Sequence, residues 1–339
     1  MKAQDNEQNP FPSEMERAEM GASRFVSEFG VNMFASSAAL LQDEDLPHIA
    51  EMSRGSEFHI YAITARPRIS IDPSTFVFNA DGFCGVFLVQ EGPNLLKFPF
   101  EVPHPPQGSV GRVESTWPHT YLTLLNGTHP VVRGKAAIFA SYLCPAIAPH
   151  LDLEVLYIGQ SFGEAGEREA PARLQSHSTL QQILGEASRL QPDREIWLAL
   201  FEMEPLLLGS FDGKLANRDP TALLADEGRI DRVLTNQVSE QQRINFAEAA
   251  LIRYFEPKYN KTFRKNFPSP EHATYRQCYD VDLNMVAAEL DTESFHARLY
   301  SAVRPPAWQH HAMFPLHDPK ERAYMLDLLT PGDGSDSKE

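Results

Sequence analysis

A short apolar run that ends in Tyr157-Ile158-Gly159 is the feature that most constrains the fold of this chain. Residues 153–158 are rich in branched and aromatic side chains, and their length suits one buried strand. A second apolar run, residues 136–143, precedes them and is joined to them by a loop that contains two prolines. Two such runs joined by a modest loop predict a β-hairpin with a glycine at the end of its second strand.

The residues after this hairpin predict helices around one further strand. A short helix is expected over residues 169–175, and a capping box predicts a second helix over residues 179–190. Residues 195–203 predict a strand. Residues 240–255 carry an apolar stripe at helical spacing, which predicts a helix that ends before Pro257. We expect residues 205–236 to form an irregular insertion.

The flanking segments differ from this centre in texture. Apolar residues at helical spacing predict a helix over residues 25–41, whereas short β-rich runs broken by proline and glycine fill residues 57–125. An acidic, β-containing segment and a polar tail are expected after residue 270. The predicted organisation has four parts: a polar and helical segment 1–45, a β-rich region 46–130, a central domain 131–268 with the insertion 205–236, and a C-terminal extension 269–339.

Composition limits the class of protein. The three cysteines, Cys84, Cys144 and Cys278, are far apart and form no CxxC pair, which argues against a disulfide framework and a cysteine-ligated zinc. The first twelve residues lack a signal-peptide pattern. No apolar stretch approaches the roughly 20 residues that span a bilayer. We therefore expect a cytoplasmic protein without a membrane partner.

The net charge of −16 first argues against a nucleic-acid partner, because such proteins usually carry a basic footprint. The distribution weakens that objection. Residues 130–265 hold 16 Lys and Arg against 18 Asp and Glu, a net charge of −2, so the flanks carry −14. The central segment also holds a basic cluster, defined as Lys258, Lys261, Arg264 and Lys265. Such a cluster is often only a solvated face, but its position around Asn260 favours contact with phosphate.

Five elements then occur in an order that resembles the GIY-YIG nuclease family: Tyr157-Ile158-Gly159, Arg173, His177, Glu248 and Asn260. The resemblance covers residues 134–265, under half of the chain. It implies an α+β fold in which a small antiparallel sheet is flanked by helices. The YIG half is matched letter for letter. The GIY half is not, since Ala140-Ser141-Tyr142 keeps only the tyrosine, and Phe139 is the competing position.

The resemblance also implies the chemistry of each residue. Phosphodiester hydrolysis needs a deprotonated water, a counter-charge for the transition state and help for the leaving oxygen. The implied catalytic residues are Tyr142, Tyr157, Arg173, His177 and Glu248. Glu248 would hold one Mg²⁺ (or Mn²⁺), and the planar Arg173 fork suits phosphate oxygens. The residues implied to contact nucleic acid are Gly159, Lys258, Asn260, Lys261, Arg264 and Lys265.

These residues predict a magnesium-dependent endonuclease that acts on DNA, and the family context suggests a role in bacterial defence. A homo-oligomer is a further possible partner. One alternative is a regulatory or binding protein built on a nuclease fold. Another is a nuclease for RNA or single-stranded DNA. Taken singly, each residue also has an ordinary structural reading.

A second cluster, Trp308, His310, His311, His317 and Asp318, fits no standard zinc spacing and is not predicted to bind metal.

Overall fold

The computed structural model describes residues 25–48, 57–160, 178–211, 220–236, 238–318 and 322–326. These residues form a mixed, strand-rich α+β fold with a large curled ten-stranded sheet and a small three-stranded antiparallel sheet. The strands are β1 (Ser27–Leu41), β2 (Ile60–Ile71), β3 (Val77–Phe78), β4 (Gly82–Glu91), β5 (Asn94–Pro103), β6 (Arg112–Glu114), β7 (Tyr121–Asn126), β8 (His129–Lys135), β9 (Leu153–Gln160), β10 (Arg194–Phe211), β11 (Met285–Asp291), β12 (Leu299–Tyr300) and β13 (Gln309–Pro315). The α-helices are α3 (Ala136–Leu143), α5 (Ser178–Leu190), α7 (Pro220–Thr235), α8 (Glu240–Phe255) and α9 (Gln277–Asp280).

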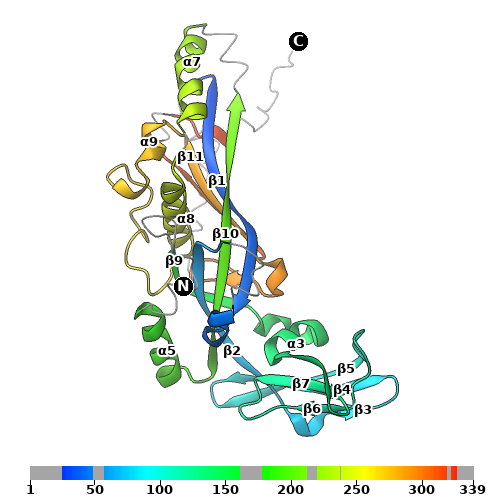
Figure 1. Cartoon of the computed structure of the whole chain (residues 1–339). Coiled ribbons are helices and arrows are strands. Elements are labelled where there is room, and N and C mark those ends of the chain that lie inside the picture. The colour runs from blue at the N-terminus through cyan, green and yellow to red at the C-terminus, as the bar shows by residue number, and fades with distance from the viewer. Residues whose placement is uncertain are drawn as a thin grey trace, which may run out of the picture.

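The large sheet draws its strands from the whole length of the chain. Its main path runs β12-β9-β2-β10-β1-β11-β13, and β3, β4 and β5 extend from one end of β2. The small sheet has the order β6-β7-β8. In Figure 1, β1 and β10 form a long ribbon, with α7 at one end and the β3–β7 region at the other. Strands predicted in residues 57–125 and after residue 270 are confirmed.

The helix predicted over residues 25–41 is wrong, because this segment is strand β1. Strand β1 pairs antiparallel with β10 along its length and parallel with β11 from Gly30 to Phe34. In the second half of β1, pairing with β10 supplies the backbone hydrogen bonds and overrides the helical preference of its alanines and leucines.

The strand predicted over residues 136–143 is also wrong, because these residues form helix α3. Ala136, Ala137 and Ala140 are buried on one face of the helix. Alanine has the highest helix propensity, and its small side chain allows this face to pack closely on the neighbouring strands. The predicted hairpin therefore does not exist, and β9 pairs with β2 and β12 instead.

The remaining central elements agree better with the sequence. The helices predicted over residues 179–190 and 240–255 are confirmed as α5 and α8, and the strand predicted over residues 195–203 is confirmed within β10. The insertion predicted as irregular is more regular than expected. Strand β10 continues to Phe211, and helix α7 fills most of the second half of the insertion.

Helices cover the two faces of the sheet around β9. Helix α8 packs against β9 and β11 (Figure 1), with Ile244, Phe246 and Leu251 in the larger core cluster. Helix α5 packs on β10 and contributes Leu180 and Ile183 to a second cluster on the other side. The strand that carries the Tyr157-Ile158-Gly159 run is therefore held between two helical layers.

Candidate active site

The Tyr157-Ile158-Gly159 run lies in the last half of β9, antiparallel to β2. The register places Tyr61 of β2 opposite Gly159 and Ile63 opposite Tyr157. The register shifts after Ile63, so Leu156 is the extra residue of a β-bulge just before the run. Bulges bend a strand and redirect side chains, and they occur often beside active sites.

Tyr61 and Tyr157 form a pair on one face of the sheet. Their ring centroids lie 6.2 Å apart with an interplanar angle of 34°. Both rings contact the core cluster on the α5 side. Tyr61 is fully buried, whereas Tyr157 is half-buried. Tyr157 is therefore the more exposed member of the pair, and its ring contacts the buried ring of Tyr61.

Gly159 leaves the space in which the two tyrosine rings meet. A Cβ atom at this position would lie 2.5 Å from the Tyr61 hydroxyl oxygen and 2.8 Å from Cε1 of Tyr157. Such distances are too short for any side chain without displacement of the rings. The close neighbours of Gly159 are thus the two tyrosines.

Asn260 holds the outer edge of β9. Its Oδ1 accepts a hydrogen bond from the Ile158 backbone N–H at 2.9 Å, and its Nδ2 donates to the Ile158 carbonyl oxygen at 2.8 Å. The Tyr259 backbone N–H donates to the carbonyl of Leu156 at 3.0 Å. Strand β12 covers β9 only at Leu153 and Glu154. The Tyr259-Asn260 segment thus takes the place of a strand beside the bulge and the tyrosine run.

The end of α8 explains why Asn260 arrives at this edge. The helix ends at Phe255, and Glu256 adopts a left-handed conformation with φ 46° before Pro257. Proline cannot donate the next helical hydrogen bond, so the chain turns away from the helix axis. This turn brings Tyr259 and Asn260 against β9.

Glu248 lies in the middle of α8 and is half-buried. One turn earlier, Asn245 accepts a hydrogen bond from the side chain of Gln160 at 2.7 Å, which joins α8 to the last residue of β9. Residues three apart on a helix share a face. Glu248 is therefore on the side of α8 that approaches the C-terminal end of β9, on the sheet face opposite to the Tyr61 and Tyr157 rings, which pack on the α5 side.

Tyr259 links the closing segment to helix α5. Its hydroxyl donates to Oε2 of Glu186 at 2.5 Å. Burial first, and then this hydrogen bond, raise the pKa of Tyr259 to about 12, while the same bond lowers the pKa of Glu186. Tyr259 therefore stays protonated at neutral pH and acts as a structural donor, not as a base.

The basic cluster lies in this closing segment and the turn after it. Lys258, Lys261 and Lys265 are exposed, and Arg264 is half-buried. The Lys258 ammonium lies 5.0 Å from the centre of the Tyr259 ring. The exposed lysines flank Asn260 in sequence, so they bring positive charge to the segment that joins the edge of β9.

Tyr142 lies apart from this arrangement. It sits on helix α3, not on a strand beside Tyr157, and 63% of its surface is exposed. Its ring packs on His296 with centroids 4.5 Å apart. Phe139, the competing position, lies on the same helix. Arg173 and His177 lie outside the described residues.

Tyr61, the ring neighbour of Tyr157, was not among the residues predicted from the sequence. It belongs to His59-Ile60-Tyr61, which keeps the isoleucine and tyrosine of a GIY pattern. The strand predicted to pair with the Tyr157 strand lay close to it along the chain, at residues 136–143. In the structure, β3 to β8 and α3 all lie between the paired strands β2 and β9. The Ile60-Tyr61 pair within a β-rich run was the sequence signal that could have indicated this strand as the partner of β9.

The one carboxylate that the sequence assigned to a metal, Glu248, limits the kind of metal site that this chain can form. Among the described residues, no three His, Cys, Asp or Glu side chains come together as a ready metal site. Mg²⁺ commonly uses one or two carboxylates and keeps several waters and substrate oxygens. A single half-buried Glu248 therefore fits Mg²⁺ bound together with a phosphate, and does not fit a closed structural site.

No family model, no curated protein and no solved structure matches this chain. Within the ranges that the structure describes, no helix has both the length and the apolar composition needed to cross a bilayer.

Proposed function

We propose that this chain is a magnesium-dependent endonuclease of the GIY-YIG type that hydrolyses phosphodiester bonds in DNA. The observation that carries the proposal is the pair of tyrosines on antiparallel neighbours β2 and β9, packed over Gly159 and braced by Asn260. The Ile-Tyr and Tyr-Ile-Gly patterns occur on adjacent strands in a register that brings their tyrosines together. Two strands far apart in sequence thus supply the two halves of the motif.

The residues divide the work as follows. Tyr157, at the solvent side of the pair, orients the attacking water, and Tyr61 fixes the position of the Tyr157 ring. The imidazole of His177 would accept the proton of that water as general base. Attack forms the new oxygen–phosphorus bond, and the bond to the leaving oxygen breaks. Mg²⁺ held by Glu248 would neutralise charge on the phosphate. Arg173 and His177 are assigned to the site by sequence resemblance alone.

The lysines of the basic cluster are assigned to the DNA backbone. Lys258, Lys261 and Lys265 are exposed and flank Asn260 in sequence. Each phosphate contact releases a counterion and adds to the salt dependence of binding. Replacing two of them with glutamine should therefore reduce the slope of log affinity against log salt by about 2.

Cleavage of supercoiled plasmid tests the proposal. The wild-type protein should nick or linearise plasmid with Mg²⁺ or Mn²⁺ and not with EDTA. Glu248→Gln should lose about 100-fold or more in rate with its fold intact. Glu240→Gln, an exposed glutamate on the same helix, is the matched control and should cleave normally.

The same assay separates the competing functions. Cleavage of RNA or single-stranded DNA but not plasmid would assign a different nuclease substrate. The complete burial of Tyr61 favours a second candidate, a non-catalytic binding protein on this fold. DNA binding without cleavage of any substrate, and with no effect of Glu248→Gln, would support that candidate.

A further inference from the structure

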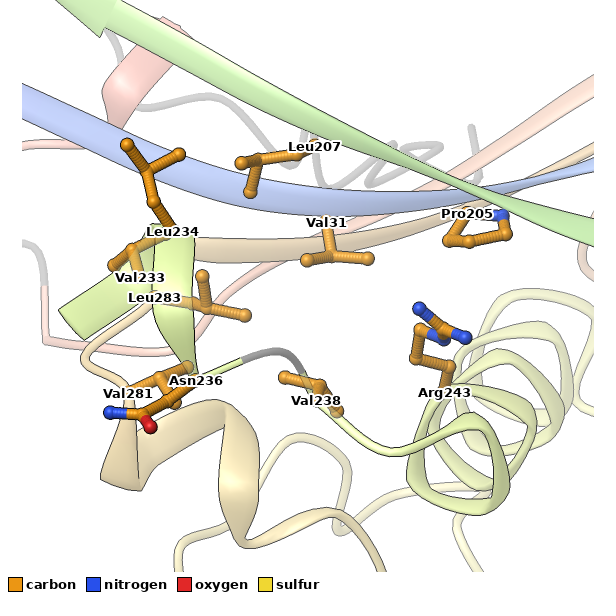
Figure 2. Close-up of a pocket in the computed structure, with 10 residues that line it drawn as sticks. All are labelled: Val31, Pro205, Leu207, Val233, Leu234, Asn236, Val238, Arg243, Val281 and Leu283. Carbon is orange, nitrogen blue, oxygen red and sulfur yellow. The ribbon is translucent and has the colours of Figure 1, made fainter. Parts of the chain in front are cut away.

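A second pocket lies away from the tyrosine site, between α7, the start of α8 and the β1–β10 ribbon. Its volume is about 230 Å³. Most of its walls are aliphatic, and Figure 2 shows these side chains arranged around the hollow. They are Val31, Pro205, Leu207, Val233, Val238 and Leu283. No aromatic ring lines the pocket among the described residues, so it suits an aliphatic chain better than a stacked base.

Arg243 brings a positive charge into this apolar space. Figure 2 shows its guanidinium reaching from α8 into the hollow between Val238 and Pro205. Its Nε is buried and has no hydrogen-bond partner in the described structure. A buried donor without a partner costs free energy, so this group is poised to bind an acceptor. The N-terminal end of α8, where Arg243 lies, adds a field of the same sign.

Three buried arginines of this protein are paired with carboxylates. Arg66, Arg229 and Arg322 lie 3.0, 3.3 and 2.5 Å from a glutamate oxygen, respectively. The Nε of the half-buried Arg243 has no hydrogen-bond partner in the part of the chain that the structure describes. A carboxylate in the pocket could accept from this planar guanidinium and would give Arg243 the kind of partner that the three buried arginines have.

The residues that lead into the C-terminal tail lie on the other face of the sheet. Val31 and Leu207, which line the pocket, are paired across β1 and β10 and so share one face. Leu208, Met285 and Ala287 point to the opposite face, because side chains alternate along a strand. Tyr324, Met325 and Leu326 pack there. Tyr324, Met325 and Leu326 thus lie on the side of the sheet away from Arg243.

We infer that this pocket binds a small aliphatic carboxylate, with the apolar chain against the valines and leucines and the carboxylate on Arg243. A cavity of roughly 150 Å³ can hold a benzene molecule, so this pocket has room for a chain of about eight carbons. The site goes beyond the proposed nuclease function. Arg243 and Glu248 share helix α8, so an occupied pocket would contact the element that carries the proposed metal ligand.

Isothermal titration of the full chain with sodium octanoate, below its micelle concentration, tests the inference. Octanoate should bind with one-to-one stoichiometry, and octylammonium chloride should not bind. Arg243→Gln should weaken octanoate binding by about tenfold or more, because a charged hydrogen-bond partner is lost. Arg232→Gln, an exposed arginine on the neighbouring helix α7, is the matched control and should bind as the wild type does.

A second variant is needed if the Arg243→Gln protein unfolds at a lower temperature than the wild type, because weaker octanoate binding could then result from lost stability. Leu234 lines the pocket but is 56% exposed, so Leu234→Glu should fold and repel octanoate through a carboxylate at the mouth. Absence of octanoate binding, or equal binding of octylammonium, would overturn the inference. Self-association of the wild type that Leu234→Glu abolishes would assign the pocket to a second copy of the chain and would also overturn it.

Discussion

Replacement of Asn260 by alanine should destabilise the protein strongly. The change removes both hydrogen bonds to Ile158 and leaves a backbone N–H and C=O without partners at a residue that is 1% exposed. A buried polar group that loses its partner costs about 1–3 kcal/mol. Two such groups, partly relieved by water at the new cavity, give an expected loss of about 3 kcal/mol in the free energy of unfolding.

Urea denaturation followed by tryptophan fluorescence measures this loss, since Trp197 is buried in the same sheet. The midpoint should fall while the slope against denaturant stays unchanged. Asn266→Ala is the control, because Asn266 is exposed and its side-chain amide is 3.1 Å from Nε2 of His272, and it should change stability by less than about 0.5 kcal/mol. A loss below about 1 kcal/mol for Asn260→Ala would refute the role of Asn260 as a brace.

Two buried groups give further predictions. Burial, the largest cause, lowers the pKa of His310 to about 4, so its stabilising effect is complete above pH 6.5 and is lost as the pH falls toward 4. The free energy of unfolding should fall by about 3 kcal/mol over this pH range. His310→Gln should flatten the plot of unfolding free energy against pH there, whereas His311→Gln, a change at an exposed histidine, should leave the plot as it is in the wild type. A plot for His310→Gln that matches the wild type would contradict the assignment. Glu195→Ala leaves the buried Arg66 without its carboxylate and should cost about 3–5 kcal/mol by thermal denaturation, whereas a small change in melting temperature would show that the pair contributes little.

Local patterns predicted some elements well. The bounds of α8 follow from an apolar stripe and a proline that stops the helix, both of which lie within the segment itself. The segment that forms strand β1 was predicted as a helix, and the segment that forms helix α3 was predicted as a strand. Apolar segments that contain several alanines are compatible with either structure. Their conformations depend on pairing with β10 and β11 in one case and on packing against the sheet in the other.

The candidate site was predictable only in part for the same reason. Asn260 hydrogen-bonds to the strand that carries Tyr157 and Gly159, since β9 and the end of α8 are adjacent in space. The partner of Tyr157 was not predictable from nearby residues. Tyr61 reaches it through antiparallel pairing of β2 with β9, and the register of that pair is set by the bulge at Leu156 and by burial on both faces.

Single-turnover cleavage of supercoiled plasmid by three tyrosine variants tests the central claim most directly. The account predicts that Tyr157→Phe loses about 100-fold in rate, that Tyr61→Phe is impaired through the altered position of Tyr157, and that Tyr142→Phe cleaves as fast as the wild type. Circular dichroism confirms that each variant is folded. Normal cleavage by Tyr157→Phe with loss in Tyr142→Phe, or no Mg²⁺-dependent cleavage by the wild type, would contradict it.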